Sequence, residues 1–139
     1  MIDFNLKMGL KGIAQTTVNE ENSAERFAKP MPPAFATPML VSLMDIAAIN
    51  AVDKFLPEGY ITVGTKVSIT HLSPTPLGMT VTAEAVLVDI FQTKLTFEVK
   101  AFDEMEKIGE GTVERYIIEL NSFNKKMMST KSKNDLGEF

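Results

Sequence analysis

The chain has 139 residues, of which 45% are hydrophobic and 23% are charged, a balance typical of one soluble globular domain. Its formal net charge is −4, which argues against nucleic-acid binding because that function normally needs a basic surface. With no cysteine and one histidine, it cannot form disulfides, thiolate or histidine-rich metal sites, or a cysteine nucleophile. The composition leaves a carboxylate-based metal site open, but no spacing of acidic residues suggests one, so we expect neither metal nor cofactor.

In chain order, the first predicted element is a short strand over residues 10–18, where β-branched residues gather. Residues 19–33 are polar and contain three closely spaced prolines, which predicts a loop with one helical turn around residues 23–27.

The N-terminal sequence MIDFNLKMGLKGIAQ lacks the basic start, apolar core and cleavage site of a secretory signal. We therefore expect a cytoplasmic protein.

One long helix is predicted next. Thr37 is expected as its N-cap and Pro38 as its first helical residue, a position where proline's missing N–H does no harm. Helix formers continue to Phe55, and Pro57 with Gly59 ends the helix. Apolar residues occur on every side, which predicts a helix buried all round. Polar residues within 38–55 argue against a membrane span: Ser42, Asp45, Asn50, Asp53 and Lys54.

Four strands are predicted after the helix, over residues 60–72, 79–90, 93–104 and 107–120. The breaks between them are short, which favours antiparallel hairpins. The result is an α+β architecture in which an antiparallel sheet wraps around one long buried helix. Residues 1–123 are expected to form this single domain, and the polar residues 124–139, which include Lys125 and Lys126, a tail outside the core.

Alternation within residues 60–72 assigns the side chains to two faces. One face is mainly apolar and is expected to pack on the helix: Ile61, Val63, Thr65, Val67, Ile69 and His71. His71 extends this face at the end of the strand, where a lone histidine is more often structural than catalytic.

Asp45 and Thr37 each have a structural and a functional interpretation. Asp45 interrupts the buried helix, where an unpaired carboxylate is costly. It either makes a structural hydrogen bond or acts as an acid, base or nucleophile in a cleft. Thr37 is explained by its N-cap role, although the N–H groups of the first helical turn would also suit an oxyanion.

Three separated motifs carry a resemblance to a known family. FATPML with VSLMDIAA, TVGTKVSITHLSPTPLG, and FEVKAFDEMEKIGEGTVERYII together resemble the fluoroacetyl-CoA thioesterase-like family of hotdog-fold proteins. The similarity runs from about residue 35 to residue 118. The resemblance implies a hotdog fold and hydrolysis of a short or medium acyl-CoA thioester at a dimer-interface site.

The family's catalytic threonine, acidic residue and histidine fall on Thr37, Asp45 and His71, and the glycine of its TVGT segment falls on Gly64, a substrate-binding position. The resemblance implies that the carboxylate attacks the thioester or activates water while the other two orient groups or carry protons. Two departures are visible. The acidic residue is typically glutamate in the family, and Val113 stands where many relatives have histidine.

Two alternatives remain open: a hotdog enoyl-CoA hydratase, and a non-catalytic domain that binds acyl-CoA or another metabolite.

The geometry of the predicted helix also bears on the oligomeric state. Eight helical residues at ~1.5 Å rise separate Thr37 from Asp45 by ~12 Å, too far for both to touch one thioester carbonyl. Either the first turn of the helix is unwound and folds back, or each site takes Thr37 from one subunit and Asp45 from another. We predict the second arrangement, an obligate homodimer or a higher homo-oligomer with composite sites.

Overall fold

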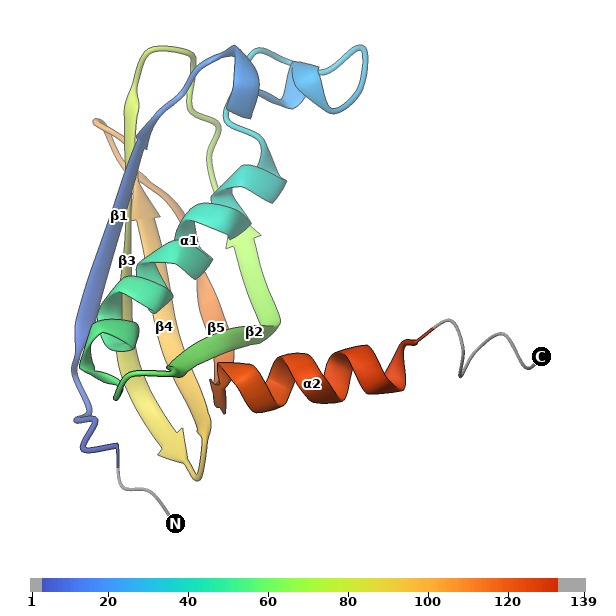
Figure 1. Ribbon diagram of the computed structural model, residues 1–139. Helices are drawn as coiled ribbons and strands as arrows, with labels where there is room; N and C mark the ends of the chain where they lie inside the picture. The colour runs from blue at the N-terminus through green and yellow to red at the C-terminus, as the bar shows by residue number, and fades with distance from the viewer. Residues whose placement is uncertain (1–3, 133–139) are drawn as a thin grey trace.

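The computed structural model describes residues 4–132 and contains a curled five-stranded antiparallel sheet that packs against one long helix (Figure 1). The strands are β1 (Lys11–Thr17), β2 (Tyr60–His71), β3 (Thr80–Phe91), β4 (Lys94–Phe102) and β5 (Lys107–Glu119). The long helix is α1 (Thr37–Val52), which the 3-10 turn η3 (Asp53–Phe55) extends. The α+β hotdog fold expected from the sequence is confirmed, as are all five strands and the long helix.

Two further 3-10 turns, η1 (Glu20–Asn22) and η2 (Ala24–Arg26), lie in the segment expected to be a loop. A second helix, α2 (Leu120–Thr130), follows β5 where only a polar tail was expected. All of its residues are exposed, so α2 lies outside the core; residues 133–139 lie outside the described residues. No helix in the described part of the chain is long and apolar enough to cross a membrane.

The strand order is β1-β3-β4-β5-β2, so β2 pairs with β5 and not with β3. The hairpins β3–β4 and β4–β5 are confirmed, but the expected hairpin between β2 and β3 is wrong. The connecting loop instead crosses the end of the β4–β5 hairpin, where the Thr75 hydroxyl donates to Asp103 Oδ2 at 2.9 Å. Pro74 and Pro76 lack the N–H groups that a tight two-stranded turn would use. As a result, β2 forms one edge of the sheet.

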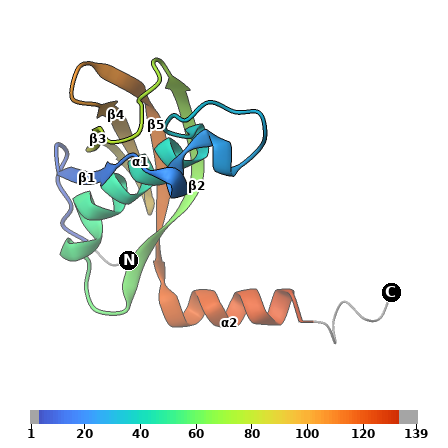
Figure 2. The same cartoon turned by 90° about the horizontal axis from the view of Figure 1, so that it is seen from above.

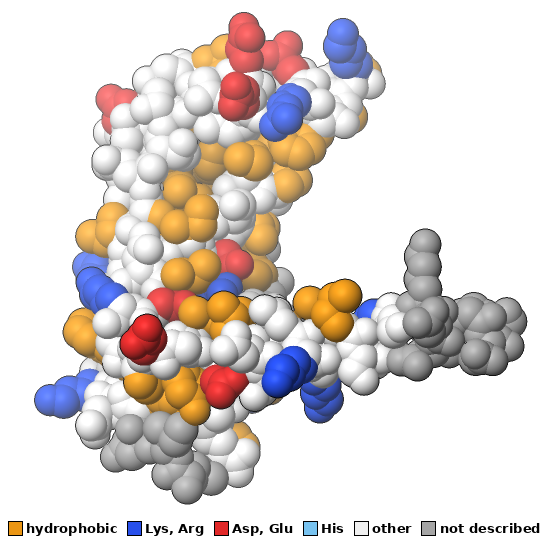
Figure 3. Space-filling model, in the orientation of Figure 1, with side chains coloured by type: hydrophobic (Ala, Val, Ile, Leu, Met, Phe, Trp, Pro, Cys, Tyr) orange, Lys and Arg blue, Asp and Glu red, His pale blue; other side chains and the backbone are white. Residues whose placement is uncertain are grey.

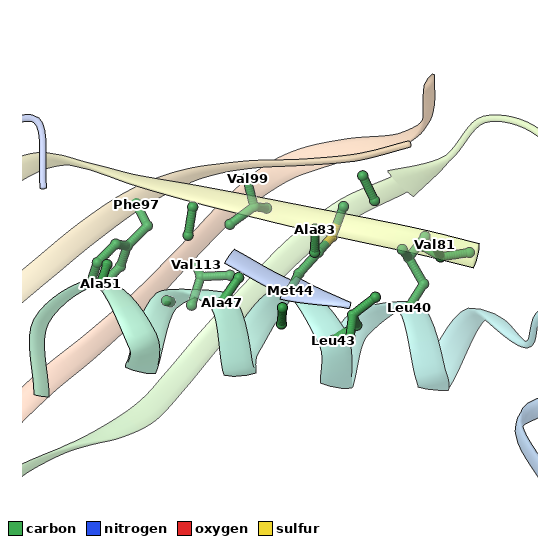
Figure 4. Packing of buried hydrophobic residues seen from close by; sticks show 14 of the residues in the cluster. Leu40, Leu43, Met44, Ala47, Ala51, Val81, Ala83, Phe97, Val99 and Val113 are labelled. Atoms are coloured by element: carbon green, nitrogen blue, oxygen red, sulfur yellow. The ribbon is translucent and has the colours of Figure 1, made fainter. Parts of the chain in front are cut away.

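The helix α1 packs on the sheet through one face (Figure 4). The residues of this face recur at helical spacing: Leu40, Leu43, Met44, Ala47, Ala48, Ala51 and Val52. The prediction of a helix buried all round is wrong for the single chain, because the sheet covers only one side. Ile46 on the other side is 44% exposed, although its side chain is apolar. Within residues 4–132, no element of the chain buries that side.

A β-bulge in β2 changes which residues face the helix. The register with β5 shifts between Gly64 and Lys66, so Thr65 has no partner across the ladder. Thr62, before the bulge, is buried, whereas Val67 and Ile69, after it, pack against the core. The single odd-numbered face expected from alternation is therefore wrong before the bulge. The extra residue moves the helix-facing set from even to odd positions.

The closest helix–sheet approach is at Gly12 in β1. A Cβ atom there would lie 2.0 Å from the Ala47 carbonyl oxygen and 2.4 Å from the Ala51 amide nitrogen. We expect Gly12→Ala to force α1 away from the sheet and to lower the free energy of unfolding by about 1–3 kcal/mol. Thermal unfolding measures this, with Thr17→Ala on the exposed face of the same strand as control. Equal melting temperatures for both variants would contradict the close packing.

Candidate active site

Asp45 projects from the middle of α1 toward β2 and β5, where it meets Arg115. The Arg115 side chain is almost completely buried, with 4% of the residue exposed, and its Nη1 donates to Asp45 Oδ1 at 2.5 Å. The Asp45 side chain is 32% exposed. A buried guanidinium is costly unless it is paired and hydrogen-bonded, so Arg115 holds the carboxylate in one position while part of it faces solvent.

The other two nitrogens of Arg115, Nε and Nη2, each donate one hydrogen bond. Its Nε donates to the Thr62 hydroxyl, and its Nη2 donates to the Thr62 carbonyl oxygen, both at 2.8 Å. The Thr62 hydroxyl in turn donates to Asp53 Oδ1 at 2.6 Å, and Asp53 Oδ2 accepts the Thr62 amide at 3.1 Å. Charge-assisted hydrogen bonds therefore connect α1, η3, β2 and β5 around one cation.

Gly64 in β2 leaves space in front of this carboxylate. A Cβ atom at Gly64 would lie 2.9 Å from Arg115 Nη1 and 3.4 Å from both Asp45 carboxylate oxygens. A side chain at this position would therefore crowd Arg115 Nη1 and lie in van der Waals contact with the carboxylate, so glycine keeps this side of Asp45 open. The surrounding pocket has a volume of about 430 Å³, and Lys66 lies on its wall.

Thr37 and His71 form a second group at the N-terminal end of α1. Thr37 Oγ1 lies 2.8 Å from His71 Nδ1, within hydrogen-bond distance. The N-cap of α1 is Ala36 and no side chain caps the helix, so the expected N-cap role of Thr37 is wrong. Thr37 is the first helical residue and Pro38 the second, which leaves the Thr37 hydroxyl available to His71.

The imidazole of His71 is half-buried, and its two nitrogens have different surroundings. Burial lowers the pKa of His71 below its usual value of about 6.5, and a backbone hydrogen bond at Ser73 opposes this shift. Its Nε2 atom is buried and has no hydrogen-bond partner within the described residues. A buried polar atom of this kind is unusual in native structures and is suited to a ligand or a reacting group.

The two groups line different pockets. Thr37 and His71 share a cavity of about 360 Å³ with the loop residues Met31 and Pro74, whereas Asp45 and Gly64 line the cavity beside Arg115. Along β2, Gly64 and His71 are seven positions apart, which corresponds to roughly 23 Å. The structure therefore brings Thr37 to His71 and Asp45 to Gly64, but it does not bring all four predicted residues together in one chain.

Arg115 was missed in the sequence, although a signal for it exists. Alternation in β5 places Val113, Arg115 and Ile117 on one face, and all three are buried. A cation on an otherwise apolar face needs an anion opposite it, and Asp45 on the buried helix was the available candidate. Val113, where the family resemblance led us to expect histidine, is a fully buried core residue and lines neither pocket.

Comparison with known proteins assigns the family. Residues 18–121 match the family described as fluoroacetyl-CoA-specific thioesterase. The fluoroacetyl-CoA thioesterase of Streptantibioticus cattleyicolor is 40% identical over 96 residues, which cover 69% of this chain and 69% of that protein. A variant of a fluoroacetyl-CoA thioesterase, solved in complex with acetyl-CoA, is 30% identical with a TM-score of 0.83, covering 91% of this chain and 99% of that one.

The fold match extends to more distant proteins. A hot-dog-like protein from Thermanaerovibrio acidaminovorans is 22% identical with a TM-score of 0.87, and the alignment covers 94% of this chain and 98% of that one. This similarity shows the fold alone. The family match over most of the chain, together with the 40% identical relative, shows that this chain belongs to the fluoroacetyl-CoA-specific thioesterase family, whose members are hotdog-fold thioesterases.

Proposed function

We propose that the protein hydrolyses a short or medium acyl-CoA thioester at sites shared between the two subunits of a homodimer. The observation that carries this proposal is the Asp45 carboxylate, which buried Arg115 holds against the space left by Gly64. A fixed carboxylate beside an open pocket suits a base or a nucleophile. The Thr37–His71 pair, with an unpaired buried nitrogen, supplies groups that can exchange protons.

The second subunit is needed because the two groups are far apart within one chain. Eight helical residues separate Thr37 from Asp45 by ~12 Å along α1, so one thioester cannot reach both. In a closed two-fold dimer, Asp45, Gly64 and Arg115 of one subunit face Thr37 and His71 of the other, and each dimer has two such sites. The exposed apolar side of α1, which includes Ile46, is then covered at the interface.

The chemistry assigned to this site is thioester hydrolysis. Asp45 either removes a proton from water as the water adds to the carbonyl carbon, or adds to that carbon itself and is released by water in a second step. In either route the carbon–sulfur bond breaks and water gives up one proton, which is carried through His71 and Thr37 to the leaving CoA thiolate. The products are a carboxylic acid and CoA.

The relatives and the side chain at position 45 both bear on the identity of the acyl group. One relative is a fluoroacetyl-CoA thioesterase and a variant of such an enzyme was solved with acetyl-CoA, which supports a small acyl group here. Asp45 is one methylene shorter than the family's usual glutamate. A displacement of ~1 Å can change a rate by ~10²-fold, so the shorter side chain suits a differently placed carbonyl.

The role of the carboxylate is tested with Asp45→Asn and Asp45→Glu. We expect Asp45→Asn to lower kcat/KM by at least ~10²-fold, because the amide cannot act as a base or nucleophile. Asp45→Glu should retain measurable hydrolysis because it keeps the charge that pairs with Arg115. Asn also weakens that ion pair, so a thermal melt must show that the variant is folded. Turnover by folded Asp45→Asn within a few-fold of the wild type contradicts the catalytic role.

A panel of acyl-CoA substrates, assayed for free thiol, separates the proposed hydrolysis from the two alternatives. Thiol release at catalytic rates supports the thioesterase. Binding of CoA esters without release supports a non-catalytic domain, and a change in enoyl absorbance without thiol supports a hydratase.

The role of His71 is tested by the pH dependence of kcat/KM. Because burial lowers its pKa, His71 stays neutral to a lower pH than a free histidine, and kcat/KM should fall only below pH ~6.5. His71→Gln should slow the reaction and remove this fall. Folding stability should also decrease as the pH falls below ~6.5, because His71 binds a proton more tightly in the unfolded chain than in the folded one. A melt at each pH therefore accompanies the assay, and an unchanged profile shape in His71→Gln rules out proton transfer by this residue.

The shared site is tested by mixing inactive subunits under conditions that allow exchange. Thr37→Val mixed with Asp45→Asn should regain about a quarter of the wild-type activity, because half of the dimers are mixed and each has one intact site. The matched control is Thr37→Val mixed with His71→Gln. Both changes damage the same half of the site, so no activity should return. Equal recovery in both mixtures, or no recovery in either after confirmed exchange, contradicts the shared site.

A further inference from the structure

The helix α2 extends away from the domain. It begins beside the start of β2, where the Leu120 amide donates to the Gly59 carbonyl oxygen at 2.9 Å, and it continues past the edge of the sheet that β2 forms (Figures 1 and 2). Its path leads into the space where a strand pairing with β2 would lie.

One side of α2 is apolar. Leu120, Phe123 and Met127 lie at spacings of three and four residues, which places them in one stripe, and each is between 38% and 45% exposed. Lys125 lies on the opposite side of the helix. An isolated helix of 11 residues is marginal in water, so α2 needs a surface on which to pack its stripe. Figure 3 shows hydrophobic side chains along α2, next to a hollow between α2 and the far end of the domain.

The far end of the domain carries a matching apolar surface, which we call the lobe, made of residues 20–36 and 72–77. Its exposed apolar side chains are Phe27, Met31, Leu72 and Leu77. Within one chain the lobe lies at the end of β2 and α2 at its start, roughly 36 Å apart along 12 strand residues. The lobe and α2 of the same chain therefore do not meet.

Two-fold symmetry brings the lobe of one chain to α2 of another. When two β2 edges meet antiparallel, the start of one strand lies beside the end of the other. A register that sets Gly64 of one chain opposite His71 of its partner, as the shared site requires, places Tyr60 and the adjoining α2 beside the partner's lobe. The occupant that fits the stripe is therefore a second copy of this chain.

We propose that α2 is an arm that crosses the dimer interface, and that its stripe of Leu120, Phe123 and Met127 packs on the partner's lobe. Met31 in the lobe lines the pocket of Thr37 and His71, so the arm forms an outer wall of the partner's site and narrows the entrance for the acyl-CoA. This inference rests on the shared site proposed above and adds a specific contact to it.

The contact is tested by cross-linking, for which the chain is well suited because it has no cysteine. Phe123→Cys subunits are mixed with Met31→Cys subunits, allowed to exchange, and treated with a short bismaleimide. We expect a covalent dimer in the mixture and none with either variant alone. The matched control is Lys125→Cys mixed with Met31→Cys, which should give little product because Lys125 is on the opposite side of α2. A short linker cannot join the two positions within one chain.

Kinetics supply a second measurement. Met127→Ala, in the stripe, should raise KM for the acyl-CoA several-fold, whereas Met128→Ala, on the same helix but outside the stripe, should leave KM unchanged. Suppose that Thr37→Val and Asp45→Asn subunits restore activity on mixing, but Phe123→Cys and Met31→Cys subunits do not cross-link. That result overturns the proposed contact of α2 but not the shared site. Equal cross-linking through Lys125→Cys also overturns the arm. A chain that is monomeric and active overturns both proposals.

Discussion

The guanidinium group of Arg115 lies where α1 crosses the sheet, and the chain has to satisfy its charge without water. Asp45 supplies the opposite charge from the helix, Thr62 supplies two oxygens from β2, and Asp53 fixes Thr62 from η3. An unpaired buried charge would cost several kcal/mol, so these groups are held in one arrangement. The same arrangement fixes the angle of the helix on the sheet and the position of the carboxylate.

Because the Asp45 carboxylate is held in place, it stays apart from the Thr37–His71 pair. Asp45 lies in the middle of α1 and faces the edge of the sheet at Gly64, whereas Thr37 begins the helix and meets His71 at the end of β2. Helix rise and strand rise set the distance between the two groups, and no side-chain rotation can close it. The exposed apolar side of α1, the edge of β2 that has no partner strand in the described chain, and the apolar stripe of α2 are the surfaces that the proposed dimer would cover.

The bulge at Thr65 links the fold to the site. Before it, even-numbered residues of β2 face the helix, which brings Thr62 to Arg115 and Gly64 to Asp45. After it, odd-numbered residues face the helix, which brings His71 to Thr37. A regular strand would have turned one of these two sets away from α1. The extra residue therefore allows a single strand to contribute to both halves of the site.

The sequence by itself determined the five strands, the long helix, the α+β class and the candidate site residues, because periodicity, proline and glycine positions, and family motifs are local properties. It located Thr37, Asp45, Gly64 and His71, and it indicated through helix rise that one chain could not join them. Only the tertiary structure decided which of them meet. The strand order, the bulge in β2 and the pairing of Arg115 with Asp45 depend on contacts between residues far apart in the chain, 70 positions for Arg115 and Asp45, which alternation along one strand does not encode.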